Sequence, residues 1–145
     1  MKTVYETIRF GGVRSNTDQL GTIIAWLVSH HLIDLKFEHE NSATISRLRM
    51  QDMTGQEFLT TVLDGEFSST FLSPEGIKFV ELYFVPGAYA RDYSMVDQAI
   101  GDQWALYREI APLISSAYHK MNSQTGIRKK IGKILRFPAF SKRGA

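Results

Sequence analysis

The sequence predicts a mainly helical fold, a compact single-domain bundle with an irregular N-terminal arm and a basic C-terminal helix or tail. Two kinds of observation favour helices. Two segments open with residues that cap helix starts, and two longer stretches repeat their apolar residues with a helical period. An α+β fold with a small sheet is the alternative.

The densest apolar stretch, residues 53–85, contains both helix starts. In the first, the Thr54 hydroxyl is placed to accept the amide of Glu57 while the Glu57 carboxylate reaches back to the amide of Thr54, which is a capping box. We expect this helix to run to about Asp64 and to end at Gly65, because glycine tolerates the left-handed conformation.

The second start is Ser73-Pro74-Glu75. Serine caps, proline suits the first turn, and glutamate suits the positive end of the helix dipole. The residues up to Val85 are apolar on most sides, which predicts a central helix ending at Pro86-Gly87. A strand is the alternative, since the run is rich in β-branched and aromatic residues.

Two longer helices are expected on either side of this stretch. Residues 17–32 follow the apolar i, i+3, i+4, i+7 pattern after a cap at Asn16 or Thr17. Residues 97–121 form a second apolar stripe, and Pro112 within it predicts a kink or a division of the helix. We expect this helix to stop at residues 122–126.

The remaining segments carry weaker patterns. We expect an irregular arm at 1–15, extended chain at 33–37, a turn at 39–42, a helix at 43–51 capped by Ser42, a core-facing loop at 66–72 and a short helix at 88–95.

Composition favours an ordinary globular protein. The 145 residues are 43% hydrophobic and 22% charged, which suits one domain. The absence of cysteine excludes disulfides and thiolate chemistry and fits a reducing compartment. No apolar run approaches the length of a membrane span, and the N-terminus has no signal-peptide core, so a cytoplasmic location is expected.

The net charge of +2 hides a strong asymmetry. Seven of the 17 basic residues and none of the 15 acidic ones lie in residues 125–145. Residues 1–124 therefore carry ten basic and 15 acidic residues, a net charge of −5. We divide the chain accordingly into a helical domain, 1–124, and a basic amphipathic tail, 125–145.

No pattern of catalytic or metal-binding residues stands out. His30 and His31 are adjacent, which is the wrong spacing for two ligands on one helix face. The carboxylate pairs Asp64/Glu66 and Asp97/Asp102 are interpreted as solvated acidic surface. Nucleophile-elbow and phosphate-loop motifs are absent, so we expect a protein that is not an enzyme and holds no cofactor or metal.

A cluster of aromatic and acidic residues is the first candidate binding surface. Tyrosine and tryptophan are favoured at protein interfaces, and carboxylates would attract a basic partner. The alternative is that the aromatic residues complete the core. The candidate partner-binding residues are Tyr83, Tyr89, Asp92, Tyr93, Asp97, Asp102 and Trp104.

The tail is the second candidate. Within residues 125–136, isoleucine and leucine share one helical face and basic residues surround the other. Docking on the acidic domain, contact with anionic membranes or nucleic acid, and contact with a protein partner are the alternatives. The basic residues are Arg128, Lys129, Lys130, Lys133 and Arg136.

Four pieces of the chain, in order, resemble a family of small bacterial proteins of unknown function. The pieces are Gly21 with Ala25-Trp26; Met53-Thr54-Gly55 with Glu57-Phe58-Leu59, an M-T-G-x-E-F-L element; Phe67, Leu72, Glu75-Gly76 and Phe79, followed by Tyr83; and Tyr93, Trp104, Tyr107 and Ala111-Pro112, a W-x-x-Y-x-x-x-A-P helix. Asp18-Gln19 stands where the family usually carries a threonine–histidine pair.

Members of this family look like immunity proteins encoded beside toxins. The resemblance thus implies a non-catalytic protein that binds and neutralises a cognate toxin domain. The acidic domain is compatible with that function, because inhibitors of nucleic-acid-directed toxins often present negative surfaces to basic active sites. A membrane- or nucleic-acid-associated adaptor acting through the tail is the alternative.

Overall fold

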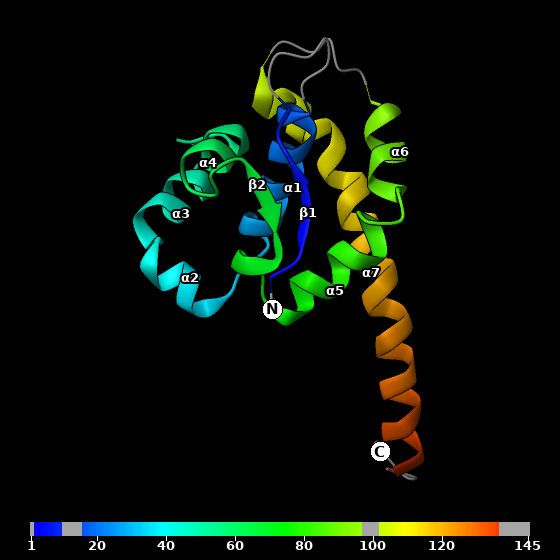
Figure 1. Ribbon diagram of the computed structural model, residues 1–145. Coiled ribbons are helices and arrows are strands. Elements are labelled where there is room, and N and C mark those ends of the chain that lie inside the picture. Colours follow the sequence, from blue (N-terminus) through cyan, green and yellow to red (C-terminus); the bar gives the residue numbers. More distant parts are fainter. Residues whose placement is uncertain (1, 10–15, 97–101, 137–145) are drawn as a thin grey trace. The chain divides into compact units, whose positions relative to one another are not determined.

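The computed structural model describes residues 2–9, 16–96 and 102–136, and side chains among them up to residue 123. The fold is mainly helical with one small antiparallel sheet (Figure 1). The elements in chain order are β1 (Val4–Thr7), α1 (Thr17–Ser29), α2 (Leu35–Glu40), α3 (Ser42–Arg49), α4 (Gly55–Thr61), β2 (Glu66–Ser68), a 3₁₀ turn η1 (Ser69–Phe71), α5 (Pro74–Tyr83), α6 (Ala88–Ser94) and α7 (Gln103–Arg136).

The central helix is α1. All nine residues from Leu20 to Val28 are buried, so α1 is covered on every side. Trp26 packs against Phe79 of α5 with ring centroids 5.4 Å apart, and α3 and α4 also contact α1. The expectation that residues 74–85 form the central helix is wrong, because α5 buries one face only and leaves Leu82 57% exposed.

Residues 4–7 form a strand, where an irregular arm was expected. β1 pairs antiparallel with β2, with an irregularity in register at Tyr5. The buried Asn16 fastens this strand to the start of α1: its amide donates to the carbonyl oxygen of Thr7, and its oxygen accepts the amide of Arg9. Asn16 is the residue before α1, but its side chain makes no capping bond, because it forms these bonds to Thr7 and Arg9 instead.

Both helix starts in the central stretch are confirmed. Thr54 and Glu57 form the capping box, with the Thr54 hydroxyl 3.1 Å from the amide of Glu57 and the returning carboxylate bond at 2.9 Å. Ser73 caps α5 by accepting the amide of Gly76 at 3.1 Å. Gly65 has a φ of 78°, the left-handed conformation expected beyond the end of α4.

The segment before α3 differs from expectation. Residues 35–40 form a helix, where extended chain and a turn were expected, because the Asp34 carboxylate caps it by accepting the amide of Phe37 at 3.0 Å. Ile33, at the start of the expected extended segment, forms an isolated bridge with Leu72. The segment from 66 to 71 is a strand and a turn, and its Phe67 and Phe71 are fully buried as predicted.

The last helix is longer than expected. α7 runs without a break through Pro112 and through residues 122–126. A division at Pro112 and the stop at residues 122–126 are therefore both wrong, and the alternative of a kink at Pro112 stays a prediction. By contact, the chain divides into two units, Met1–Ile114 and Ser115–Ala145. The division into a domain of 1–124 and a tail of 125–145 stays a prediction.

Candidate functional site

The three tyrosines of the expected aromatic surface lie in the core. Tyr83, Tyr89 and Tyr93 are 4%, 0% and 9% exposed, because α5 and α6 turn their rings inward in a chain of ring contacts at 5.8 and 6.0 Å. Rings this buried offer almost no area to a partner, so the alternative, that they complete the core, describes the structure.

Hydrogen bonds hold two of these tyrosines. The Tyr89 hydroxyl donates to the carbonyl oxygen of Gln19 in α1, and the Tyr83 hydroxyl donates to Asp92 at 2.6 Å. Burial raises the pKa of Tyr89 well above its ordinary value and raises that of Tyr83 with help from Asp92. Burial and the nearby Asp18 raise the pKa of Tyr93 to about 12. All three rings are therefore neutral structural groups near neutral pH.

The other members of the expected surface are more accessible. Asp92 is half-buried through its bond to Tyr83, and Asp102 is exposed and accepts the amide of Ala105 at the start of α7. Trp104 is half-buried and lies edge-on to Tyr107 at 5.2 Å. Asp97 lies outside the described residues.

For the basic tail, the structure describes backbone alone. Arg128, Lys129, Lys130, Lys133 and Arg136 lie on the helical backbone of α7, and their side chains are outside the described part. Their binding role stays a prediction.

The histidines are all exposed. His30 stacks on Trp26 with ring centroids 4.0 Å apart, and its Nδ1 lies 2.9 Å from the carbonyl oxygen of Trp26. His31 has a φ of 61° just beyond the end of α1. Among the described residues, no group of three histidine, aspartate or glutamate side chains is arranged to hold a metal ion.

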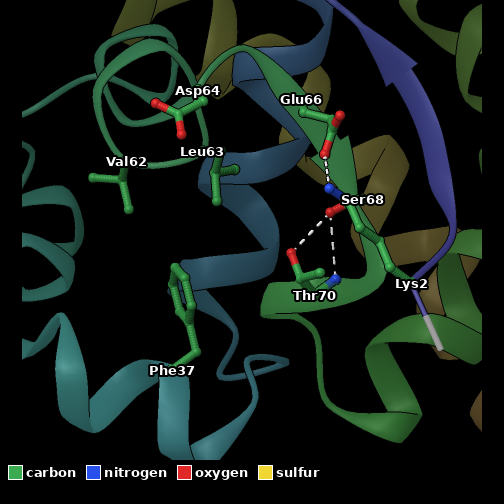
Figure 2. A pocket seen from close by; sticks show the side chains of 8 residues that line it. All are labelled: Lys2, Phe37, Val62, Leu63, Asp64, Glu66, Ser68 and Thr70. Carbon is green, nitrogen blue, oxygen red and sulfur yellow. Dashed lines mark hydrogen bonds and ion pairs between the residues drawn. The ribbon is translucent and has the colours of Figure 1, made fainter.

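A pocket of about 360 Å³ lies beside β2 (Figure 2). β2 places Glu66 and Ser68 on one face, toward the pocket, and the intervening Phe67 on the other, in the core. The full lining is Lys2, Phe37, Val62, Leu63, Asp64, Glu66, Ser68 and Thr70.

Polar groups dominate one wall of this pocket and apolar side chains the other. Lys2 forms an ion pair with Glu66, and the hydroxyls of Ser68 and Thr70 lie 2.8 Å apart. Figure 2 shows Phe37, Val62 and Leu63 facing these groups. The pair Asp64/Glu66, expected to be plain acidic surface, thus contributes to the pocket. Lys2 and Phe37 had no sequence signal for this role, since they come from segments distant from the run 62–70.

Glycines in the segments that carry the resemblance have packing roles. A Cβ at Gly55 would lie 1.8 Å from the carbonyl oxygen of Gly21, so α1 and α4 cross with backbone against backbone. A Cβ at Gly76 would lie 2.5 Å from the carbonyl oxygen of Leu32. These glycines allow close approach of the main chain and carry no chemistry of their own.

The fold and the pocket define a mainly helical domain with a small antiparallel sheet and a mixed polar and apolar hollow beside it. The chain belongs to the family of domains of unknown function DUF7832, which it matches over residues 14–105, more than half of its length. Comparison with curated proteins and with solved structures found no match. Along the described residues, no helix has the length and apolar character needed to cross a bilayer.

Proposed function

We propose that this protein is a cytoplasmic immunity-type protein that binds a cognate toxin domain and neutralises it by covering its surface. The observation that carries the proposal is charge: residues 1–124 hold 15 acidic and ten basic residues. An excess of carboxylates steers and orients a basic partner. The sequence resemblance to immunity proteins supplies the class of partner.

Ion pairs within the domain leave this excess intact. Lys2, Arg9, Arg47 and Arg49 pair with Glu66, Glu6, Asp52 and Glu38. Each pair neutralises one positive and one negative charge, so the excess of five negative charges comes from acidic residues outside these pairs. Asp18, Asp64 and Asp102 are exposed carboxylates outside these pairs, and Asp92 is half-exposed.

Growth rescue tests the proposal. The toxin domain encoded beside this gene is expressed in a host with and without this protein, with a catalytically inactive toxin as the control for burden. We expect full protection at matched expression. Toxicity that persists although the protein accumulates in folded form contradicts the proposal.

One observation favours a second candidate, an adaptor that binds an anionic membrane or nucleic acid through the tail. The backbone of α7 is helical to Arg136, as an amphipathic binding helix requires. Deletion of residues 125–145 should abolish sedimentation with anionic vesicles and mobility shifts of DNA at low salt. If the full chain shows neither, this second candidate is wrong.

A further inference from the structure

The pocket beside β2 carries one unbalanced negative charge. Lys2 neutralises Glu66 at its rim. The remaining acid, Asp64, has no hydrogen-bond or ion-pair partner among the described residues, and it is exposed. The lining therefore has a net charge of −1, and that charge is available to a ligand.

The backbone fixes the position of Asp64. This residue follows α4 with a φ of 54°, and Gly65 after it has a φ of 78°. The amide of Gly65 donates to the carbonyl oxygen of Leu59 at 2.8 Å, which closes the end of the helix. The carboxylate is thus presented from a defined turn (Figure 2).

The rest of the lining supplies hydrogen-bond acceptors and an aromatic face. The hydroxyls of Ser68 and Thr70 bond to each other, and the buried Ser68 oxygen also accepts the amide of Thr70. The exposed Thr70 oxygen is therefore the one that keeps a lone pair for a donor. Phe37 packs against Phe58 and Phe71, with ring centroids 6.4 and 5.9 Å away, and its ring is half-buried. These contacts fix the position of the ring, and its accessible part can stack on a ligand.

We propose that this pocket receives the guanidinium group of an arginine side chain from a protein partner. A guanidinium carries five donors in one plane and stacks on aromatic rings, so its chemistry matches a lining that offers a carboxylate, a hydroxyl oxygen and an aromatic ring. A pocket of about 360 Å³ is at the small end for ligands and suits a side chain. The inference rests on the proposed function, which requires a basic partner.

The test is a titration of the ¹⁵N-labelled full chain with the peptide acetyl-Gly-Arg-Gly-amide, followed by amide chemical shifts. We expect saturable shifts, in the millimolar range, confined to the amides of the pocket-lining residues. The same peptide with citrulline, which keeps the shape and loses the charge, should bind about tenfold more weakly. The lysine peptide should also bind more weakly than the arginine peptide.

Asp64→Asn is the decisive variant. Asparagine adopts the left-handed conformation at least as readily as aspartate, so this variant keeps the turn while it removes the charge. We expect arginine-peptide affinity to fall about tenfold. Glu109→Gln removes one negative charge from an exposed site on α7 that does not line the pocket, and it should leave the titration unchanged.

Three results would overturn the inference: no saturable shift at the pocket, equal binding of the citrulline peptide, or unchanged affinity in Asp64→Asn. In the growth assay, Asp64→Asn and the wild type could protect the host equally. That result would reject the arginine contact in the pocket and would leave the immunity function standing. Because the titration uses the free protein, a failed rescue by the wild type rejects the function separately.

Discussion

At the scale of single residues, the contact between Gly21 and Gly55 decides how α1 and α4 cross. The space for a side chain at Gly55 is taken by a backbone oxygen, which cannot rotate away as a side chain can. Thr54 and Glu57, which flank Gly55 in the sequence, cap the start of α4. Their role was predictable because a capping box involves only neighbouring residues. The role of the glycine was invisible without the neighbouring helix.

Gly55→Ala should destabilise the fold by about 3 kcal/mol or more, although alanine is the better helix former, because the two helices must separate. Urea unfolding measures the effect. Gly87→Ala is the control: its φ of 104° is strained for alanine, but nothing lies within 4 Å, so we expect a cost of about 1–2 kcal/mol. Equal costs for both variants would contradict the packing argument.

Tyr93 should make the fold sensitive to alkali. Its pKa is raised to about 12, whereas an unfolded tyrosine ionises near 10. Above pH 10 the unfolded chain loses a proton that the folded chain keeps, so stability falls as pH rises from 10 to 12. Urea unfolding at pH 8 and at steps above 10 should show this fall, and Tyr93→Phe should reduce it. An identical pH dependence in the two proteins would be evidence against this assignment.

At the scale of elements, helix starts with local chemistry were predictable. The start of α4 is predictable from four consecutive residues and that of α5 from three, and both are formed as expected. The helix α2 was missed because six residues give too little periodicity, and β2 because three residues give no alternation. The end of α7 was misplaced because Gly126 and polar residues only weaken a helix, and the chain continues through them.

The capping box gives a quantitative test of this local reasoning. Thr54→Ala removes the hydroxyl that satisfies the amide of Glu57, and it should cost about 1 kcal/mol in urea unfolding. Thr60→Ala on the same helix is the matched control, since its exposed hydroxyl bonds only to carbonyl oxygens one turn back. We expect that control to be within about 0.5 kcal/mol of wild type. A Thr60→Ala cost as large as that of Thr54→Ala would show that the cap is not the cause.

The pocket marks the limit of sequence reasoning about elements. Its lining joins Lys2 and Phe37 to a run from Val62 to Thr70, and only the fold brings these segments together. The burial of the three tyrosines of the expected aromatic surface was hidden for the same reason. Tyrosine is common both at interfaces and in cores, so its presence in the sequence does not distinguish the two. In the structure, Tyr89 packs against α1 and is buried in the core.

At the scale of the whole molecule, charge is the property that the sequence states most clearly. Residues 1–124 carry five more acids than bases, and residues 125–145 carry seven basic residues without an acid. The average, +2, describes neither part. The proposed function uses the acidic part for a basic toxin domain, and the pocket supplies one specific contact within it.

The most direct test of binding by charge complementarity is a calorimetric titration of this protein with the proposed toxin domain, purified from the neighbouring gene, at low salt and at about 0.15 M salt. The account predicts a one-to-one complex whose association weakens as salt rises. Absence of a complex at low salt, or an affinity that salt leaves unchanged, would contradict it.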